Sequence, residues 1–170
     1  MKLSFIIISF KSDHLLENLL SKIPNKHEII IIENSLQIQT KYKIEKKYSN
    51  SKVIIPKKNL GYATALNKAF KICKNNFVIT MSPDIRIQKK LITNIESLLS
   101  KFKNFILMAP EYKNKKIYKN FLPISENKTL WKIKNYNLIK VKEIDWCFCI
   151  LNKSKFKNSK VLDENYFLYF

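Results

Sequence analysis

Apolar residues in the first 110 positions form short continuous runs that alternate with stretches of helical periodicity. Continuous runs rich in β-branched and aromatic side chains, with no polar alternation, are typical of strands buried on both faces of a sheet. The runs that predict strands are 3–10, 28–32, 52–55, 77–81 and 105–109. Proline follows three of these runs at once or within two residues, at Pro56, Pro83 and Pro110.

The stretches between the runs repeat their apolar side chains at the spacing of one helical face. After Ser12-Asp13, which offers an N-cap, leucines recur at 15, 16, 19 and 20, and Pro24-Asn25 ends the pattern. A polar helix is expected near 42–48, an Ala-rich helix after Gly61, and an amphipathic helix over 89–102. This alternation predicts an α/β fold with an open, mostly parallel sheet and helices on both faces.

The second part of the chain is less regular. Residues 111–140 carry Lys, Asn and isolated aromatic side chains, which indicates a long surface connection, and 141–151 predicts one further strand. We expect a single domain over 1–170 with two halves, 1–110 and 111–170. The aromatic residues up to Phe170 are expected to need a covering surface, so the second half is interpreted as incomplete.

Composition excludes several classes of protein. A chain of 170 residues with 46% hydrophobic residues is too apolar for a disordered protein. No apolar run approaches the roughly 18–20 residues of a membrane span. Lys2 before the first apolar run imitates a signal peptide, but 9–13 turns polar without a cleavage site. We therefore expect a cytoplasmic protein.

The net charge of +19 first indicates a nucleic-acid partner. Only Arg86 among the 32 basic residues is an arginine, however, and the lysines are scattered along the chain. Arginine supplies the bidentate contacts that nucleic-acid readers favour. We expect a solvated basic surface without a nucleic-acid partner, which could hold the protein near anionic lipid head groups at the inner face of the membrane.

The cysteines and histidines do not have metal-ligand spacing. Cys147 and Cys149 are expected on the same face of a strand, where they act as small hydrophobic residues, and Cys73 lies on a predicted helix. His14 and His27 are expected at the surface, each at the edge of an element.

Polar clusters follow three of the predicted strands, at 33–35, 58–61 and 82–84. The carboxyl ends of parallel strands meet at one edge of an open sheet, where ligands bind. Glu33 could accept hydrogen bonds from a base or ribose, and the start of the helix at Gly61, the only glycine, suits a ribose or phosphate. Asp84 could hold a divalent cation on a diphosphate. Each cluster could also be an ordinary turn; their common placement favours a site for a nucleotide diphosphate.

Several segments, in order, resemble the motifs of family 2 glycosyltransferases with the GT-A fold, most closely their rhamnosyltransferase-type branch. These segments are SFKS (9–12), IIENS (31–35), NLGYATALN (59–67), MSPDIR (81–86), IDWCFCIL (144–151) and LDENYFLYF (162–170). The match runs along nearly the whole chain. The resemblance implies that 1–110 binds a nucleotide-sugar and that 111–170 forms the acceptor side.

The resemblance also implies roles for individual residues. The donor nucleotide would contact Ser9, Lys11, Glu33, Asn59, Gly61 and Asn67, while Asp84 would hold Mg²⁺ or Mn²⁺ on the diphosphate, and Asp145 and Trp146 would edge the acceptor side.

The chain departs from the family pattern at three places. Ser82 replaces a more usual Asn or Asp, Phe148 replaces a small glycine, and the acidic pair that would supply the general base is expected beyond Phe170. The resemblance implies inverting, metal-assisted transfer of a sugar to a lipid-linked or polysaccharide acceptor. Two alternatives stay open: an inactive copy that only binds nucleotide-sugar, and, less favoured, a basic nucleic-acid-binding module.

Overall fold

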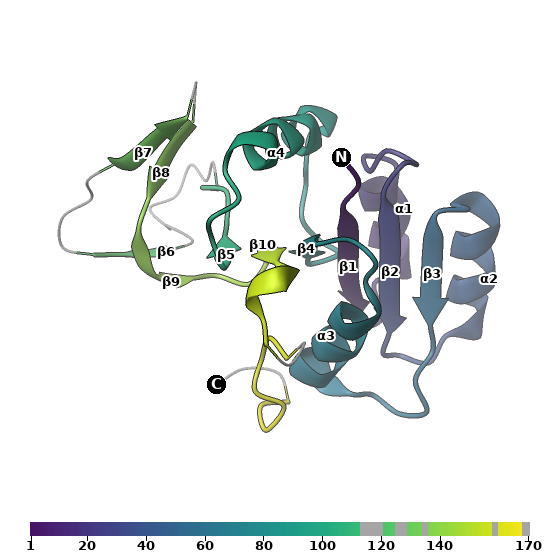
Figure 1. Cartoon of the computed structure of the whole chain (residues 1–170). Coiled ribbons are helices and arrows are strands. Elements are labelled where there is room, and N and C mark those ends of the chain that lie inside the picture. Colours follow the sequence, from purple (N-terminus) through teal and green to yellow (C-terminus); the bar gives the residue numbers. More distant parts are fainter. Residues whose placement is uncertain (113–120, 125–128, 134–135, 158–159, 168–170) are drawn as a thin grey trace.

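A sheet of six strands in the order β3-β2-β1-β4-β10-β5 forms the centre of the molecule (Figure 1). The structure is a computed structural model that describes residues 1–112, 121–124, 129–133, 136–157 and 160–167. The strands of this sheet are β1 (Ser4–Ser9), β2 (Glu28–Glu33), β3 (Ser51–Ile54), β4 (Phe77–Met81), β5 (Leu107–Met108) and β10 (Phe148–Asn152). The first four are mutually parallel, and β10 runs antiparallel to both β4 and β5.

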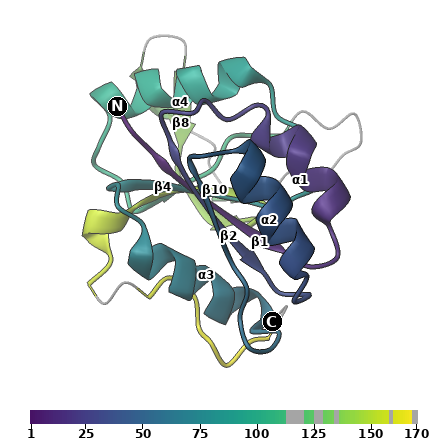
Figure 2. The ribbon, with the colours of Figure 1, turned by 90° about the vertical axis from the view of Figure 1, so that its right-hand side faces the viewer.

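Helices cover both faces of this sheet, as Figure 2 shows. The helices are α1 (Asp13–Leu20), α2 (Ile38–Lys47), α3 (Gly61–Ile72) and α4 (Lys89–Lys101), and a 3-10 turn follows β10 at Lys153–Lys155. One apolar cluster joins α1, α2 and α4 to one face, and a second joins α3 to the other. The predicted α/β fold, with an open, mostly parallel sheet between helices, is confirmed.

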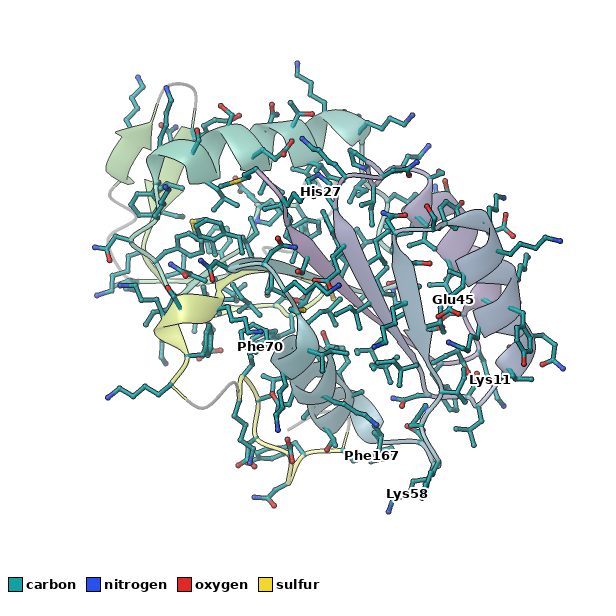
Figure 3. All side chains as sticks on the ribbon, turned by 45° about the vertical axis from the view of Figure 1, so that its right-hand side comes forward. Lys11, His27, Glu45, Lys58, Phe70 and Phe167 are labelled. Atoms are coloured by element: carbon teal, nitrogen blue, oxygen red, sulfur yellow. The ribbon has the colours of Figure 1, made fainter. Side chains whose placement is uncertain are left out.

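The side chains of each buried strand alternate between the two faces of the sheet, so that one strand contributes to both apolar clusters. Successive side chains of a strand point to opposite faces. Phe5 and Ile7 therefore enter the cluster under α1 and α4, while Ile6 enters the cluster under α3. Phe70 of α3, labelled in Figure 3, is fully buried in that second cluster. Its ring meets that of Phe156 edge to face, with ring centroids 5.3 Å apart.

Two element boundaries differ from the sequence prediction by more than one residue, at the start of α2 and at the start of β5. Helix α2 begins at Ile38, four residues before the predicted start, because its first turn is anchored by a carboxylate that periodicity does not reveal. Strand β5 is shorter than the predicted 105–109, because only Leu107 and Met108 pair with β10.

The prediction of one strand over 141–151 is wrong. Strand β9 (Val141–Ile144) pairs with β6 (Phe121–Pro123) in a separate two-stranded sheet, and only β10 joins the central sheet. A turn separates them, in which Asp145 Oδ1 accepts the Cys147 N–H at 3.3 Å. The turn forms because a carboxylate can bond the backbone two residues further on.

The connection expected over 111–140 contains strands that the sequence did not reveal. Besides β6, the structure has β7 (Thr129–Ile133) antiparallel to β8 (Tyr136–Ile139), and both lie away from the central sheet in Figure 1. The parts of this connection at 113–120, 125–128 and 134–135 lie outside the described residues. Of the residues that are described, no helix has the length and apolar character needed to cross a bilayer.

One of the two histidines is not where the sequence placed it. His14 is exposed as expected, but His27 is 1% exposed and packs edge to face against Phe5. Its Nδ1 accepts the Leu3 N–H at 3.2 Å, and its Nε2 lies 3.9 Å from Glu96 Oε1. Burial lowers the pKa of His27, although Glu96 opposes the shift.

We expect His27 to make the protein less stable in mild acid. Protonation would place a hydrogen on Nδ1, where the Leu3 N–H already points, so the folded state resists the proton that the unfolded chain accepts near pH 6.5. The contribution of neutral His27 to the unfolding free energy should be fully present above about pH 6.5. It should fall below that value until the folded state is protonated as well. Urea unfolding between pH 5 and 8 measures this.

The matched variants for that experiment are His27→Asn and His14→Asn. The first keeps an acceptor for Leu3 and should remove the loss of stability in acid, whereas the second changes an exposed histidine and should leave the loss intact. An unchanged acid loss in His27→Asn would contradict the assignment.

Candidate functional site

The predicted polar loops meet at one edge of the central sheet. Ser9 pairs with Glu33 at the carboxyl ends of β1 and β2, and Met81 ends β4 beside them. Because β10 runs the other way, it begins at this edge, where Phe148 pairs with Met81. The turn at 145–147 thus joins the loops at 9–12, 33–35 and 82–84, and the Ser82 N–H donates to the Cys147 carbonyl at 2.9 Å.

The loops after β1 and β2 are tied together by hydrogen bonds. The Asn34 N–H donates to the Ser9 carbonyl at 2.7 Å, and the Lys11 N–H donates to Ser35 Oγ at 3.1 Å. Lys11 has a φ of 53°, a left-handed conformation uncommon for a residue with a side chain. Its side chain is exposed at this edge, whereas Ser9 is fully buried with its Oγ 3.0 Å from Ser12 Oγ.

Glu33 uses its carboxylate to build the loop that follows β2. The residue is 1% exposed; its Oε1 accepts from the N–H and the hydroxyl of Ser35, and its Oε2 accepts the Gln37 N–H at 2.7 Å. Gln37 is the N-cap of α2, so this carboxylate also satisfies a backbone donor at the start of that helix. A contact between Glu33 and a nucleotide base stays a prediction.

Asn34 joins β2 to the start of α3, a role that the sequence reasoning did not assign to it. Its Nδ2 donates to the Gly61 carbonyl at 3.1 Å, and its Oδ1 accepts the Leu60 N–H at 3.3 Å. Asn59 caps the same turn, with its Oδ1 2.9 Å from the Gly61 nitrogen. The position of Asn34, at the carboxyl end of a buried strand, is the sequence feature that could have indicated this role.

Gly61 occupies a position that only glycine fits easily. Its φ is +70°, and a Cβ at this position would lie 2.3 Å from the carbonyl oxygen of Phe167. The next residue, Tyr62, donates its N–H to that same oxygen at 2.8 Å. The start of α3, expected to face a ribose or phosphate, therefore contacts a segment from the far end of the chain, as Figure 3 shows near Phe167.

Asn67 is buried one and a half turns further along α3, and its hydrogen bonds go to residues 161–164. Its Oδ1 accepts from the N–H groups of Val161 and Leu162, and its Nδ2 donates to the Leu162 carbonyl and to Glu164 Oε1. The sequence analysis placed Asn67 against a nucleoside. That contact stays a prediction.

Two carboxylates flank the Cys147 thiol at this edge. Asp84 follows β4 and Asp145 precedes β10, and both are exposed. Cys147 Sγ lies 3.2 Å from Asp145 Oδ1 and donates to it. Burial and this contact raise the pKa of the Cys147 thiol to about 11, and the charge of Asp84 adds to the rise. The loop after β4 and the turn before β10 thus each present one exposed carboxylate at this edge.

A site for Mg²⁺ or Mn²⁺ at this edge stays a prediction. These hard cations prefer carboxylate and phosphate oxygens and keep several waters, so one or two carboxylates suffice when a diphosphate supplies the rest. Asp84 in the loop after β4 and Asp145 in the turn before β10 would be the carboxylates available. Among the residues described, no group of three His, Cys, Asp or Glu side chains forms a metal centre by itself.

Trp146 links this edge to the core beneath α3. Its side chain is half-buried against the cluster that contains Phe70, and its carbonyl oxygen lies 3.4 Å from the Tyr62 hydroxyl. Burial raises the pKa of Tyr62, and the nearby Cys149, Cys147 and Asp145 act in the same direction. Trp146 thus connects the turn at 145–147 to α3.

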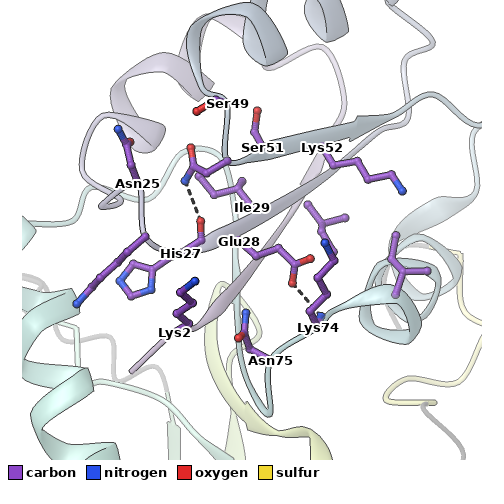
Figure 4. A pocket seen from close by; sticks show the side chains of 14 residues that line it. Lys2, Asn25, His27, Glu28, Ile29, Ser49, Ser51, Lys52, Lys74 and Asn75 are labelled. Atoms are coloured by element: carbon purple, nitrogen blue, oxygen red, sulfur yellow. Dashed lines mark hydrogen bonds between the residues drawn. The ribbon is translucent and has the colours of Figure 1, made fainter.

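A hollow of about 440 Å³ lies at the opposite edge of the sheet, where β1, β2 and β3 begin (Figure 4). Hydrogen bonds in its wall close turns: Asn50 Nδ2 donates to the His27 carbonyl, and the Lys74 N–H donates to Glu28 Oε2, both at 2.9 Å. The residues predicted to bind the donor do not line this hollow. We therefore place the candidate site at the carboxyl edge.

Comparison with known proteins gives a family match over most of the chain. The sequence model described as "Glycosyl transferase family 2" matches residues 4–159. A similar curated protein is the low-salt glycan biosynthesis hexosyltransferase Agl10 of Haloferax volcanii, 23% identical over 181 aligned positions that cover 99% of this chain and 58% of that protein. The chain thus spans less than two thirds of the length of this relative.

Solved structures share the fold. S. aureus TarS 1–349 in complex with UDP-GlcNAc matches with a TM-score of 0.56 and 21% identity, over 72% of this chain and 38% of that one. The mannosyltransferase PcManGT from Pyrobaculum calidifontis, in complex with GDP-Man and Mn²⁺, matches with a TM-score of 0.54 and 15% identity, over 62% and 34%.

Proposed function

The chain belongs to glycosyl transferase family 2, and from that premise we propose that it takes part in transferring a hexosyl group from a nucleotide-diphospho-sugar to a lipid-linked or polysaccharide acceptor. The observation that carries the proposal is that the loop carrying Asp84 and the turn carrying Asp145 are joined at the carboxyl edge of the sheet, where the Ser82 N–H donates to the Cys147 carbonyl at 2.9 Å. Relatives of the same fold bind UDP-GlcNAc, or GDP-Man with Mn²⁺.

In this proposal Asp84 would hold a divalent cation, and Asp145 would add negative charge from the turn before β10. When bound, Mg²⁺ or Mn²⁺ neutralises the charge that develops on the departing diphosphate. Asp84 is exposed, and the loop that carries it is tied to the turn before β10 by the bond from the Ser82 N–H to the Cys147 carbonyl. Charges already in place stabilise a leaving group without reorganisation during the reaction.

The nucleoside would lie along the loops after β1 and β2. Lys11 presents an exposed ammonium group there, and its backbone is fixed by Ser35. Ser9, Glu33, Asn59 and Gly61 complete the proposed donor wall, through the loop geometry that their own hydrogen bonds maintain. Asn67 would act on this wall indirectly, through its bonds to residues 161–164.

The acceptor would approach from the side of Asp145 and Trp146, with 111–170 forming that side and 1–110 forming the donor side. Transfer with inversion also needs a base that takes the proton of the acceptor hydroxyl. We assign that role to none of the described residues. The rhamnosyltransferase-type branch, a cytoplasmic location and contact of the many lysines with anionic lipid at the inner membrane face belong to the same proposal.

A donor panel tests the proposal directly. Thermal unfolding of the protein with UDP-, GDP- and dTDP-sugars, each with and without Mn²⁺, should show a rise of several degrees for one nucleotide that needs the cation. Absence of any rise would contradict a donor site on this chain. A metal-dependent rise without transfer to any glycan or lipid-linked acceptor would instead support an inactive copy that only binds the donor.

A further inference from the structure

We propose that Asn67 is a positioning residue that fastens residues 160–167 along α3, beside the candidate donor site. The segment follows β10 in the chain and runs beside α3 from Asn67, in the middle of the helix, to Tyr62 at its start (Figure 2). This inference rests on the proposed function only for its consequence in catalysis; the fastening itself is a property of the fold.

The carboxamide of Asn67 uses its full hydrogen-bonding capacity on this segment. An asparagine amide offers two donor hydrogens and two acceptor lone pairs. Here Oδ1 accepts from Val161 at 2.8 Å and Leu162 at 3.1 Å, while Nδ2 donates to the Leu162 carbonyl at 2.8 Å and to Glu164 Oε1 at 2.9 Å. Asn67 is 6% exposed. In this arrangement the Asn67 amide binds residues 161–164 and has no hydrogen-bonding group left for a nucleoside.

A second anchor lies five residues earlier on the same helix, at Tyr62. The Tyr62 N–H donates to the Phe167 carbonyl, and Gly61 lets that carbonyl approach where any Cβ would stand 2.3 Å away. At the first anchor, Val161 and Leu162 also pack on the apolar cluster that contains Phe70. Hydrogen bonds at both ends of the segment and apolar contact at the Asn67 end define a seat for it on α3.

The seat is connected to the donor loops. Gly61, which receives Phe167, is bonded through its own carbonyl to Asn34, and Asn34 is bonded to Ser9 at the end of β1. Loosening of 160–167 would therefore reach the loops after β1 and β2. In the proposed transferase, the fastening sets where the acceptor-side segment stands relative to the donor.

Hydrogen exchange tests the fastening without any substrate. In Asn67→Ala, the amides of Val161, Leu162 and Tyr62 should exchange about tenfold faster or more, because local opening loses its main restraint. Asn18→Ala, the same change at an exposed position of α1, should leave exchange of this segment unchanged. Equal protection of 160–167 in Asn67→Ala and wild type would overturn the proposal.

A second variant covers the case in which Asn67→Ala does not fold. Glu164 is exposed and contributes only one of the bonds, so Glu164→Ala should fold normally and speed exchange of the segment a few-fold. Unchanged exchange of 160–167 in Glu164→Ala would overturn the proposal in that case.

Steady-state kinetics separates positioning from direct contact. A positioning role predicts that Asn67→Ala lowers kcat while the donor KM stays within about twofold. A direct nucleoside contact predicts a raised donor KM with unchanged exchange of 160–167, and that result would overturn our inference. If wild type binds no donor at all, the proposed function fails, yet the exchange comparison still decides whether Asn67 fastens the segment.

Discussion

Replacing Asp84 by asparagine is expected to abolish the metal-dependent part of donor stabilisation and to slow transfer by a factor on the order of 10²–10³. Asparagine has nearly the same shape, so the change removes the charge and little else. A neutral amide is a poor ligand for Mg²⁺ or Mn²⁺ compared with a carboxylate. Asp84 is exposed, so we expect unfolding free energy to change by less than about 0.5 kcal/mol.

The measurement pairs thermal unfolding with donor and Mn²⁺ against transfer rates at saturating donor. Glu143→Gln is the matched control, because it neutralises another exposed carboxylate, on β9. It should retain the full response. A donor response in Asp84→Asn with wild-type metal dependence would show that the cation is held elsewhere, and Asp145→Asn would then be the variant to examine.

Replacing Gly61 by alanine is expected to destabilise the protein strongly, by about 2–3 kcal/mol. The left-handed backbone at φ +70° costs about 1–2 kcal/mol for a residue with a Cβ. The new methyl group would in addition lie 2.3 Å from the Phe167 carbonyl oxygen and 2.7 Å from Cδ2 of its ring. Urea unfolding at pH 7 measures the loss, and exchange of 160–167 reports whether the segment is displaced.

Gly61→Asn separates the two causes of that loss. Asparagine tolerates the left-handed region better than alanine but carries the same Cβ. Similar losses in both variants would assign the effect to the contact with Phe167, and recovery in Gly61→Asn would assign it to the backbone. If the unfolding free energy of Gly61→Ala lies within about 0.5 kcal/mol of the wild-type value, and 160–167 stays protected from hydrogen exchange, the close approach of Phe167 to Gly61 is contradicted.

The sequence predicted the central strands well where burial alone decides the pattern. The run at 77–81 is apolar on both faces and forms β4 with the predicted bounds, and the run at 28–32 extends by only one residue to Glu33. The prediction failed where a single side chain interrupts the pattern. Asp145 turns the chain between β9 and β10, and Glu33 starts α2 early, because each bonds a nearby backbone group that periodicity cannot detect.

His27 shows that a polar residue type does not by itself predict an exposed side chain. A histidine at the start of a strand was expected at the surface, but the fold buries it, since Leu3 supplies a donor from the neighbouring strand region and Phe5 supplies an apolar wall. Neither partner is close to His27 along the chain.

By itself, the sequence determined the α/β layering and the edge at which polar loops gather, because a parallel sheet always brings its carboxyl ends together. The tertiary structure alone decided what the polar side chains at that edge contact. Asn67 bonds to Leu162, 95 residues away, and Gly61 meets Phe167 across a comparable span of chain. Local periodicity records which residues are buried, whereas partners so distant in sequence are selected only when the sheet and its covering helices are packed together.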